Sequence, residues 1–124
     1  MTSVADFCDR WEAQPLIHPQ TQLPQPLRSE LAARRRNNNL SGLHHSLLGL
    51  GSGVLPSLWG DLAGMPPALC LFGDKDEKFG RVAGLMEARN CGLKAVKVSG
   101  CGHAPHLENP GALATLLAEF LLSR

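Results

Sequence analysis

The stretch ALCLFGDKDEKF, residues 68–79, contains the pattern that decides the fold of this chain. Its first six residues, Ala68–Gly73, form a continuous apolar run after Pro67, which is typical of a buried parallel strand. Acidic residues come directly afterwards, at Asp74 and Asp76. The pattern therefore predicts a buried strand that runs straight into a turn carrying carboxylates.

A second strand and a histidine turn follow. Lys94–Gly100 (KAVKVSG) predicts the next strand, and the turn Ser99–Pro110 (SGCGHAPHLENP) places glycines around His103. An acid after one strand and a histidine after the next are the last two members of the order Ser…Asp…His, which one class of catalytic triads follows. The sequence therefore raises the hypothesis of an acid–histidine pair, with Asp76 or Asp74 as the acid.

The serine that would complete this order is missing from the 124 residues. The Gly/Ser cluster GLGSG, residues 49–53, lacks the G-x-S-x-G spacing because Leu50 stands two positions before Ser52. No strand is predicted in front of it. We interpret this cluster as a turn that breaks a helix.

Helical periodicity dominates the rest of the chain. Residues 15–27 hold four prolines and little periodicity, so they predict an extended crossing. The apolar spacing elsewhere predicts a first helix that is capped by Thr2 or Ser3 and ends by Gln14. It also predicts a helix from about Ser41 to Leu50, with leucines on one face, and a helical turn at Pro56–Leu62. The other predicted helices are Leu27–Arg36, Lys78–Arg89 and Gly111–Leu122. The last helix is expected to turn five apolar side chains inward: Leu113, Leu116, Leu117, Phe120 and Leu121.

These elements predict an α/β chain that does not close a core by itself. Two parallel strands need both faces covered and usually both edges paired. We therefore expect a partial fold, with a helical segment over residues 1–64 and a β-α-β-α part over residues 65–124. A missing N-terminal half, or another chain, would complete the sheet.

Composition and charge narrow the classes of function. The net charge is +1 and apolar residues make up 44% of the chain, which favours a folded domain over a nucleic-acid or membrane-surface binder. No apolar run approaches the length of a membrane span, and the first residues predict no signal peptide. The four cysteines have no CxxC spacing, so we expect reduced thiols and an intracellular location.

The strand–acid and strand–histidine pattern resembles the α/β-hydrolase superfamily. GCGHAPHLENP, residues 100–110, is similar to the G-x-G-H-x-x-x-x-E-x-P turn with which that superfamily presents its catalytic histidine before a final helix. The resemblance implies a partial α/β-hydrolase fold: a helical lid, then the last two parallel strands and their helices. The superfamily places its nucleophile elbow G-x-S-x-G and an H-G loop upstream of the lid, and neither is in this sequence.

Three further stretches resemble the MenH-type 2-succinyl-6-hydroxy-2,4-cyclohexadiene-1-carboxylate synthases within that superfamily. FCDRWEAQPL (Phe7–Leu16) is similar to their lid motif, RRRNNNLSGLHHSLLGLGSGVLPSLW (Arg34–Trp59) to their R-x-x-N-N stretch, and GDKDEKF (Gly73–Phe79) to their acid loop. The resemblance implies a lyase that eliminates pyruvate from 2-succinyl-5-enolpyruvyl-6-hydroxy-3-cyclohexene-1-carboxylate in menaquinone or phylloquinone biosynthesis, with no metal or organic cofactor. Without the serine, we expect the chain alone to be inactive.

The resemblance also assigns roles to single residues. It makes Asp76 the acid that orients His103, and it makes His103 the general base and acid. Arg35 would be the lid residue that binds a substrate carboxylate through a bidentate fork. Trp11 and Trp59 match lid tryptophans of the family and would line the substrate site. Phe79, after the acid loop, is expected in the core or at the floor of the pocket.

Simpler interpretations stay open for each of these residues. Asp74 and Asp76 could both cap the helix that follows them, because a helix N-terminus favours negative charge. His103 could be an exposed loop residue, and three adjacent arginines leave open which of Arg34–Arg36 faces the site. The aromatic residues could serve packing alone. Nothing near the histidine supplies the third and fourth ligands of a metal site, so we expect no metal.

Two other classes of function also stay open. One is a different α/β-hydrolase, such as an esterase or a C–C hydrolase, and the other is a non-catalytic truncated chain or pseudoenzyme. The expected ligand is a small carboxylate, and the expected partners include neither nucleic acid nor a membrane. The expected location is the cytoplasm, or the plastid in a photosynthetic eukaryote.

Overall fold

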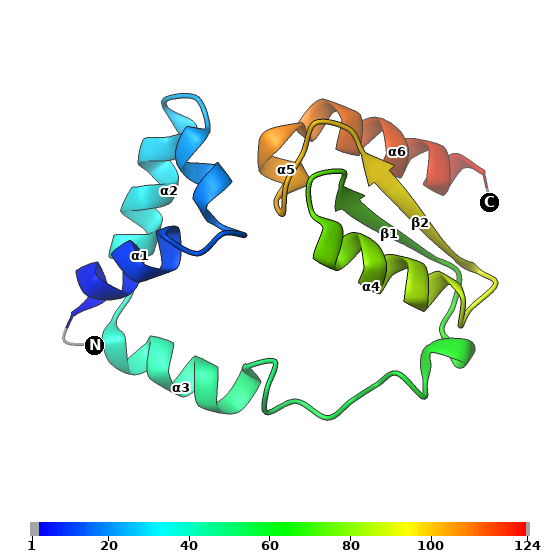
Figure 1. Cartoon of the computed structure of the whole chain (residues 1–124), viewed down its shortest axis with the longest axis horizontal. Helices are drawn as coiled ribbons and strands as arrows, with labels where there is room; N and C mark the ends of the chain where they lie inside the picture. Colours follow the sequence, from blue (N-terminus) through cyan, green and yellow to red (C-terminus); the bar gives the residue numbers. More distant parts are fainter. Residues whose placement is uncertain (1–2, 124) are drawn as a thin grey trace. The chain divides into compact units, whose positions relative to one another are not determined.

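The computed structural model describes residues 3–123, which form two compact units that follow one another along the chain (Figure 1). The first unit ends at Ser57 and its regular elements are helices. The second unit begins at Leu58 and contains the sheet. The predicted boundary between lid and core, after residue 64, stays a prediction.

Side-chain caps mark the starts of two helices of the first unit, the first and the third. Ser3 Oγ accepts the N–H of Asp6 at 3.1 Å, so the predicted serine cap is confirmed, and Thr2 lies outside the described residues. Asn39 Oδ1 accepts the N–H of Gly42 at 2.6 Å, which starts the third helix one residue earlier than predicted. The elements are α1 (Val4–Glu12), the 3₁₀ helix η1 (His18–Gln22), α2 (Leu27–Arg36) and α3 (Leu40–Leu50).

Two predictions for the connecting segments are wrong. Residues 15–27 are not an extended crossing throughout, because η1 lies within them. Proline is tolerated in the first turn of a helix, where its missing N–H has no intrahelical partner, so the proline-rich sequence did not exclude a short helix. The helical turn predicted at Pro56–Leu62 lies later, as η2 (Leu62–Gly64). The buried Asn90 fixes its place, because its Nδ2 donates to the carbonyls of Leu62 (2.7 Å) and Met65 (3.1 Å).

The second unit is a two-stranded parallel sheet with helices beside it. The strands pair in register from Ala68 opposite Leu93 to Gly73 opposite Val98, and they lie between α4 and α6 in Figure 1. The elements are β1 (Ala68–Gly73), α4 (Glu77–Glu87), β2 (Leu93–Val98), α5 (Pro105–Glu108) and α6 (Pro110–Leu122). The strands and the two longer helices were predicted within one or two residues, whereas the one-turn helix α5 was not.

Burial is lower than the sequence predicted. Only Gly73 of β1 is fully buried, and the rest of the strand is half-buried. On α6, Leu117 and Leu121 are exposed rather than turned inward, and on α3 the predicted apolar face is exposed at Leu47 and Leu48. The reason is the small number of elements available to cover these side chains within each unit. Among the described residues, no helix has both the length and the apolar character that crossing a membrane requires.

Candidate active site

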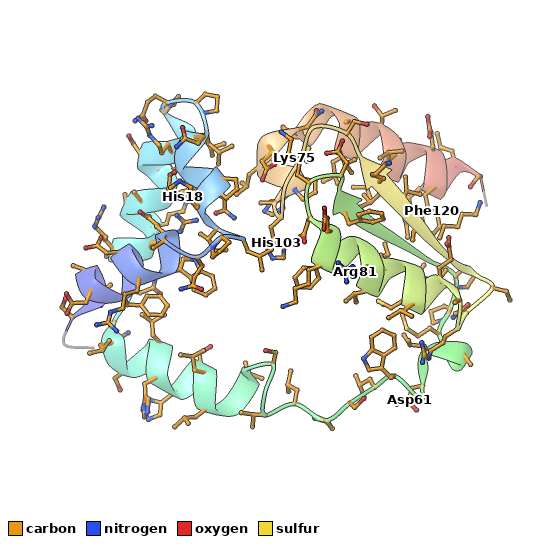
Figure 2. The ribbon with its side chains drawn as sticks, in the orientation of Figure 1. His18, Asp61, Lys75, Arg81, His103 and Phe120 are labelled. Carbon is orange, nitrogen blue, oxygen red and sulfur yellow. The ribbon has the colours of Figure 1, made fainter. Side chains whose placement is uncertain are left out.

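The candidate site lies where the two strands end. Because β1 and β2 are parallel, the loops that follow Gly73 and Val98 leave the sheet at the same end. Two backbone hydrogen bonds hold these loops together: Asp74 N donates to Val98 O at 3.0 Å, and Lys75 N donates to Cys101 O at 2.9 Å. Figure 2 labels Lys75 and His103 on the two loops.

Two glycines shape these loops, one by leaving room for their close approach and one by its backbone conformation. A Cβ atom on Gly73 would lie 2.1 Å from the carbonyl oxygen of Gly102 and 2.3 Å from that of Cys101, so a side chain there has no room. Gly100 has a φ of +74°, in the left-handed region that favours glycine. The sequence GCG therefore shapes the turn that carries the histidine.

Asp76 and His103 form a direct hydrogen bond. His103 Nδ1 lies 2.7 Å from Asp76 Oδ2, and the side chain of Asp76 is only 4% exposed. The other carboxylate oxygen, Oδ1, accepts the N–H of Phe79 at 3.1 Å and caps α4. The capping and the histidine-orienting interpretations of Asp76 therefore hold together. Asp74, the other candidate acid, is exposed.

The Nε2 atom of His103 is available to accept a proton, because the bond to Asp76 uses Nδ1. A carboxylate can only accept hydrogen bonds, so the proton of a neutral imidazole resides on Nδ1 and Nε2 presents a lone pair. The side chain is 33% exposed, which leaves a ligand access to the ring. Phe79 packs against it, with the ring centroids 4.7 Å apart and the planes tilted by 48°. Asp76, Phe79 and His103 thus form one cluster.

Glu108 was not among the site residues predicted from the sequence. Its carboxylate accepts the N–H of Gly102 through Oε2 and that of Ala104 through Oε1, the latter at 3.3 Å. These two amides lie on either side of His103. The signal was present in the motif G-x-G-H-x-x-x-x-E-x-P, whose glutamate is Glu108.

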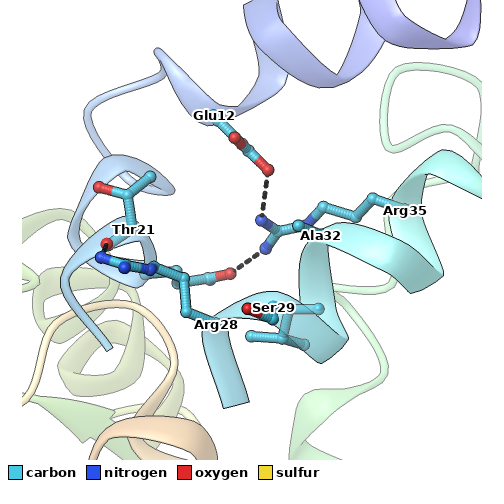
Figure 3. A pocket seen from close by; sticks show the side chains of 8 residues that line it. Glu12, Thr21, Arg28, Ser29, Ala32 and Arg35 are labelled. Atoms are coloured by element: carbon cyan, nitrogen blue, oxygen red, sulfur yellow. Dashed lines mark hydrogen bonds and ion pairs between the residues drawn. The ribbon is translucent and has the colours of Figure 1, made fainter. Parts of the chain in front are cut away.

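Arg35 lines a pocket of about 220 Å³ in the first unit (Figure 3). Its Nη1 donates to Glu12 Oε1 at 3.1 Å, and its Nη2 donates to Gln20 Oε1. Its side chain is 21% exposed, against 73% for Arg34 and 54% for Arg36, so Arg35 is the arginine of the three that faces inward within its unit. The residues around the pocket are Glu12, Gln20, Thr21, Arg28, Ser29, Leu31, Ala32 and Arg35.

The two tryptophans belong to different units, and only Trp59 shares its unit with the acid–histidine cluster. Trp11, in the first unit, is exposed and stacks on Phe7 with centroids 6.0 Å apart. Trp59, in the second unit, lies under the Arg89 guanidinium at 5.0 Å and borders a pocket with Met86. Met86 follows Phe79 by seven residues, about 10 Å along α4, so Trp59 is at the other end of that helix from the cluster. A substrate-binding role stays a prediction for both.

The cysteine thiols and the possible metal ligands are further candidate reactive groups. All four cysteines are free thiols, and burial raises the pKa of Cys70 and, together with the charges of Glu108 and Asp74, that of Cys101. A raised thiol pKa disfavours the reactive thiolate. Within residues 3–123, no group of three or more His, Cys, Asp or Glu side chains is placed to hold a metal ion.

Comparison with known proteins supplies the context of this geometry. No protein-family model matches the chain. A curated protein of Bacillus subtilis (strain 168) is 33% identical over 118 residues, and its name assigns it provisionally as a 2-succinyl-6-hydroxy-2,4-cyclohexadiene-1-carboxylate synthase. One of Escherichia coli O17:K52:H18 (strain UMN026), named as that synthase, is 34% identical over the same length. The solved structure of MenH from S. aureus matches 97% of the chain with a TM-score of 0.92 and 29% identity.

These matches cover nearly all of this chain but under half of each relative. Both curated alignments include 94% of the chain, which spans only 43% of those proteins and 46% of the S. aureus chain. The similarity to part of these synthases, expected from the sequence, is confirmed. So is the fold class, a partial α/β-hydrolase fold with helices followed by two parallel strands and their helices.

Proposed function

We propose that this chain, as a relative of the MenH-type synthases, supplies the lid and the acid–histidine part of a lyase in menaquinone or phylloquinone biosynthesis. The observation that carries the proposal is the 2.7 Å hydrogen bond between His103 Nδ1 and the buried Asp76. It joins the ends of two adjacent parallel strands in a chain that is similar to these synthases over 94% of its length.

The reaction is the elimination of pyruvate from 2-succinyl-5-enolpyruvyl-6-hydroxy-3-cyclohexene-1-carboxylate. A serine oxygen removes a proton from the substrate ring, and the carbon–oxygen bond to the enolpyruvyl group breaks. His103 accepts the serine proton at Nε2, because Nδ1 is held by Asp76. The carboxylate of Asp76 stabilises the imidazolium that forms. His103 then donates that proton as a general acid to the departing enolpyruvate, which becomes pyruvate, while the serine keeps the proton taken from the ring. These steps need no metal or organic cofactor.

The substrate carboxylates would be held by the lid. Arg35 is the candidate because its guanidinium lines a pocket and is only partly used by Glu12 and Gln20. A guanidinium has five N–H donors, so donors remain for a carboxylate beside those two bonds. Phe79, which packs on His103, would shield the reacting ring from water. Trp11 in the first unit and Trp59 in the second are further candidates for contact with the substrate.

The serine must come from polypeptide outside this sequence. We propose that an N-terminal half in the same chain, or a separate chain, supplies the G-x-S-x-G turn and further strands. The support is that this chain spans 43% of its curated relatives. The 124 residues alone would then be inactive. The bacterial source of both relatives favours the cytoplasm over a plastid as the location.

A second candidate function is an ester or C–C hydrolase. The Asp76–His103 hydrogen bond fits it as well, because the same pair serves nucleophilic serines in hydrolysis. The similarity to the synthases is what favours the lyase. A non-catalytic role is the third candidate, since the 124 residues of this chain contain no G-x-S-x-G nucleophile elbow.

A fusion protein separates these functions. The part of the Bacillus subtilis relative that this chain does not match is joined in front of residue 1, and the purified fusion is assayed for pyruvate release and for hydrolysis of p-nitrophenyl esters. We expect pyruvate release from the enolpyruvyl substrate and none from the 124 residues alone. Ester hydrolysis faster than pyruvate release would favour the hydrolase. A folded fusion with neither activity would favour the non-catalytic role.

A further inference from the structure

The carboxylate of Glu108 binds the backbone on both sides of His103. Oε2 accepts the N–H of Gly102 and Oε1 accepts the N–H of Ala104. Glu108 is the last residue of α5, the single turn that follows the histidine loop. The backbone closes the same loop, since Ala104 O accepts the N–H groups of Leu107 (2.9 Å) and Glu108 (3.0 Å).

These two amides require an acceptor with two oxygens. Gly102 and Ala104 are both buried, and a buried N–H without an acceptor is costly. An ionised carboxylate offers an acceptor to each. A glutamine of the same shape offers one oxygen and would turn an NH₂ group, a donor, toward the other amide.

Two groups approach residue 102 of the turn closely, one on each side. A Cβ atom on Gly102 would lie 3.3 Å from Glu108 Oε1 and 3.5 Å from Oε2. Opposite, the Gly102 carbonyl approaches Gly73 so closely that a Cβ atom there would lie at 2.1 Å. Residue 102 is therefore clamped between the end of β1 and Glu108. Loss of the Glu108 carboxylate would therefore leave the backbone that carries His103 free to shift on that side.

We propose that Glu108 is a positioning residue for His103, which keeps Nδ1 against Asp76 and fixes the direction of Nε2. This role rests on the proposed function in one respect, that His103 is the group that moves the proton. Glu108 also acts on Cys101 in the same turn. Burial raises the pKa of the Cys101 thiol, and the negative charge of Glu108 raises it further.

The first test uses the 124-residue chain and needs no activity. Glu108→Gln is compared with Glu119→Gln, an exposed substitution on α6, by amide exchange and by ¹⁵N NMR of the imidazoles. In Glu108→Gln we expect amide exchange of Gly102 and Ala104 to become at least about tenfold faster. We also expect His103 to lose its preference for the Nδ1–H form, while the amides of β1 and β2 stay protected. Unchanged His103 signals overturn the proposal.

The second test measures catalysis in the fusion protein. We expect Glu108→Gln to lower kcat roughly ten- to a hundredfold with little change in KM, because a small displacement of a catalytic group has effects of this order. The limb of the pH–rate profile that reports His103 should also shift, and Glu119→Gln should leave both unchanged. An unchanged kcat in a folded, active Glu108→Gln fusion overturns the proposal. If the parent fusion is inactive, the proposed function fails, and the NMR result still decides the role of Glu108.

Discussion

Asp76 uses its two oxygens for two different tasks. Oδ1 accepts the N–H of Phe79 and starts α4, while Oδ2 binds the imidazole of His103. The sequence presents these tasks as alternatives, since an acid before a helix is explained by capping alone. The structure shows that one residue does both, so the start of α4 and the orientation of His103 depend on the same side chain.

Replacing Asp76 by asparagine should separate these two tasks. Asparagine caps helices about as well as aspartate, so the stability of α4 should change little. Its amide can donate to Nδ1, which favours the imidazole form with the proton on Nε2. We therefore expect ¹⁵N NMR of the Asp76→Asn chain to show His103 changing from the Nδ1–H to the Nε2–H form. Asp76→Ala, which loses both tasks, should also destabilise the chain, and retention of the Nδ1–H form in Asp76→Asn would contradict this account.

Cys101 should make the stability of the chain fall at alkaline pH. Burial, with the charges of Glu108 and Asp74, raises the pKa of its thiol in the folded state. Above about pH 8.5, where a thiol ordinarily ionises, the unfolded state releases a proton that the folded state keeps, so the free energy of unfolding decreases as pH rises. Urea unfolding at a series of pH values should therefore show a smaller decrease in Cys101→Ala than in the parent chain. Equal pH dependence in the two proteins would contradict this assignment.

At the scale of elements, the sequence was sufficient where a pattern is local. The apolar run before Asp74 and the spacing of α2 and α6 identify those elements to within one or two residues. The 3₁₀ helices η1 and η2 were missed or misplaced because distant residues stabilise them. Gln20 of η1 accepts a hydrogen bond from Arg35, and η2 is held by Asn90. A local sequence pattern cannot predict contacts between residues that are so far apart in the chain.

Asn90 should be the polar residue on which the start of the second unit most depends. Its Nδ2 donates to Leu62 O and Met65 O, and its Oδ1 accepts the N–H of Gly92 at 2.7 Å. Asn90→Ala removes all three bonds from a buried position, so we expect a loss of about 2–3 kcal/mol in the free energy of unfolding. Urea denaturation followed by circular dichroism measures it. Lys94→Ala, an exposed change on β2, should stay within about 0.5 kcal/mol, and equal effects of the two substitutions would rule out this role for Asn90.

At the scale of the whole molecule, the sequence predicts the class of site better than its surroundings. The acid–histidine pair follows from two strand-and-turn patterns, because parallel strands bring the loops after them to the same end of the sheet. The extent of burial could not be predicted in the same way. Leu47 of α3 and Leu121 of α6 have the spacing of inward-facing residues, yet both are exposed in units that offer them no cover. Amphipathic spacing predicts which face of a helix is apolar. It does not predict which element, if any, covers that face.

We propose that His103 performs the proton transfer of a pyruvate-eliminating lyase when another polypeptide segment supplies the serine. The most direct measurement compares pyruvate release by the fusion protein with that of its His103→Ala and His106→Ala variants. His106 is an exposed histidine three residues further on, and the hydrogen bond to Asp76 is made by His103. We predict that His103→Ala lowers kcat roughly a thousandfold or more, whereas His106→Ala retains the parent rate. A folded His103→Ala fusion that releases pyruvate as fast as the parent would contradict the account.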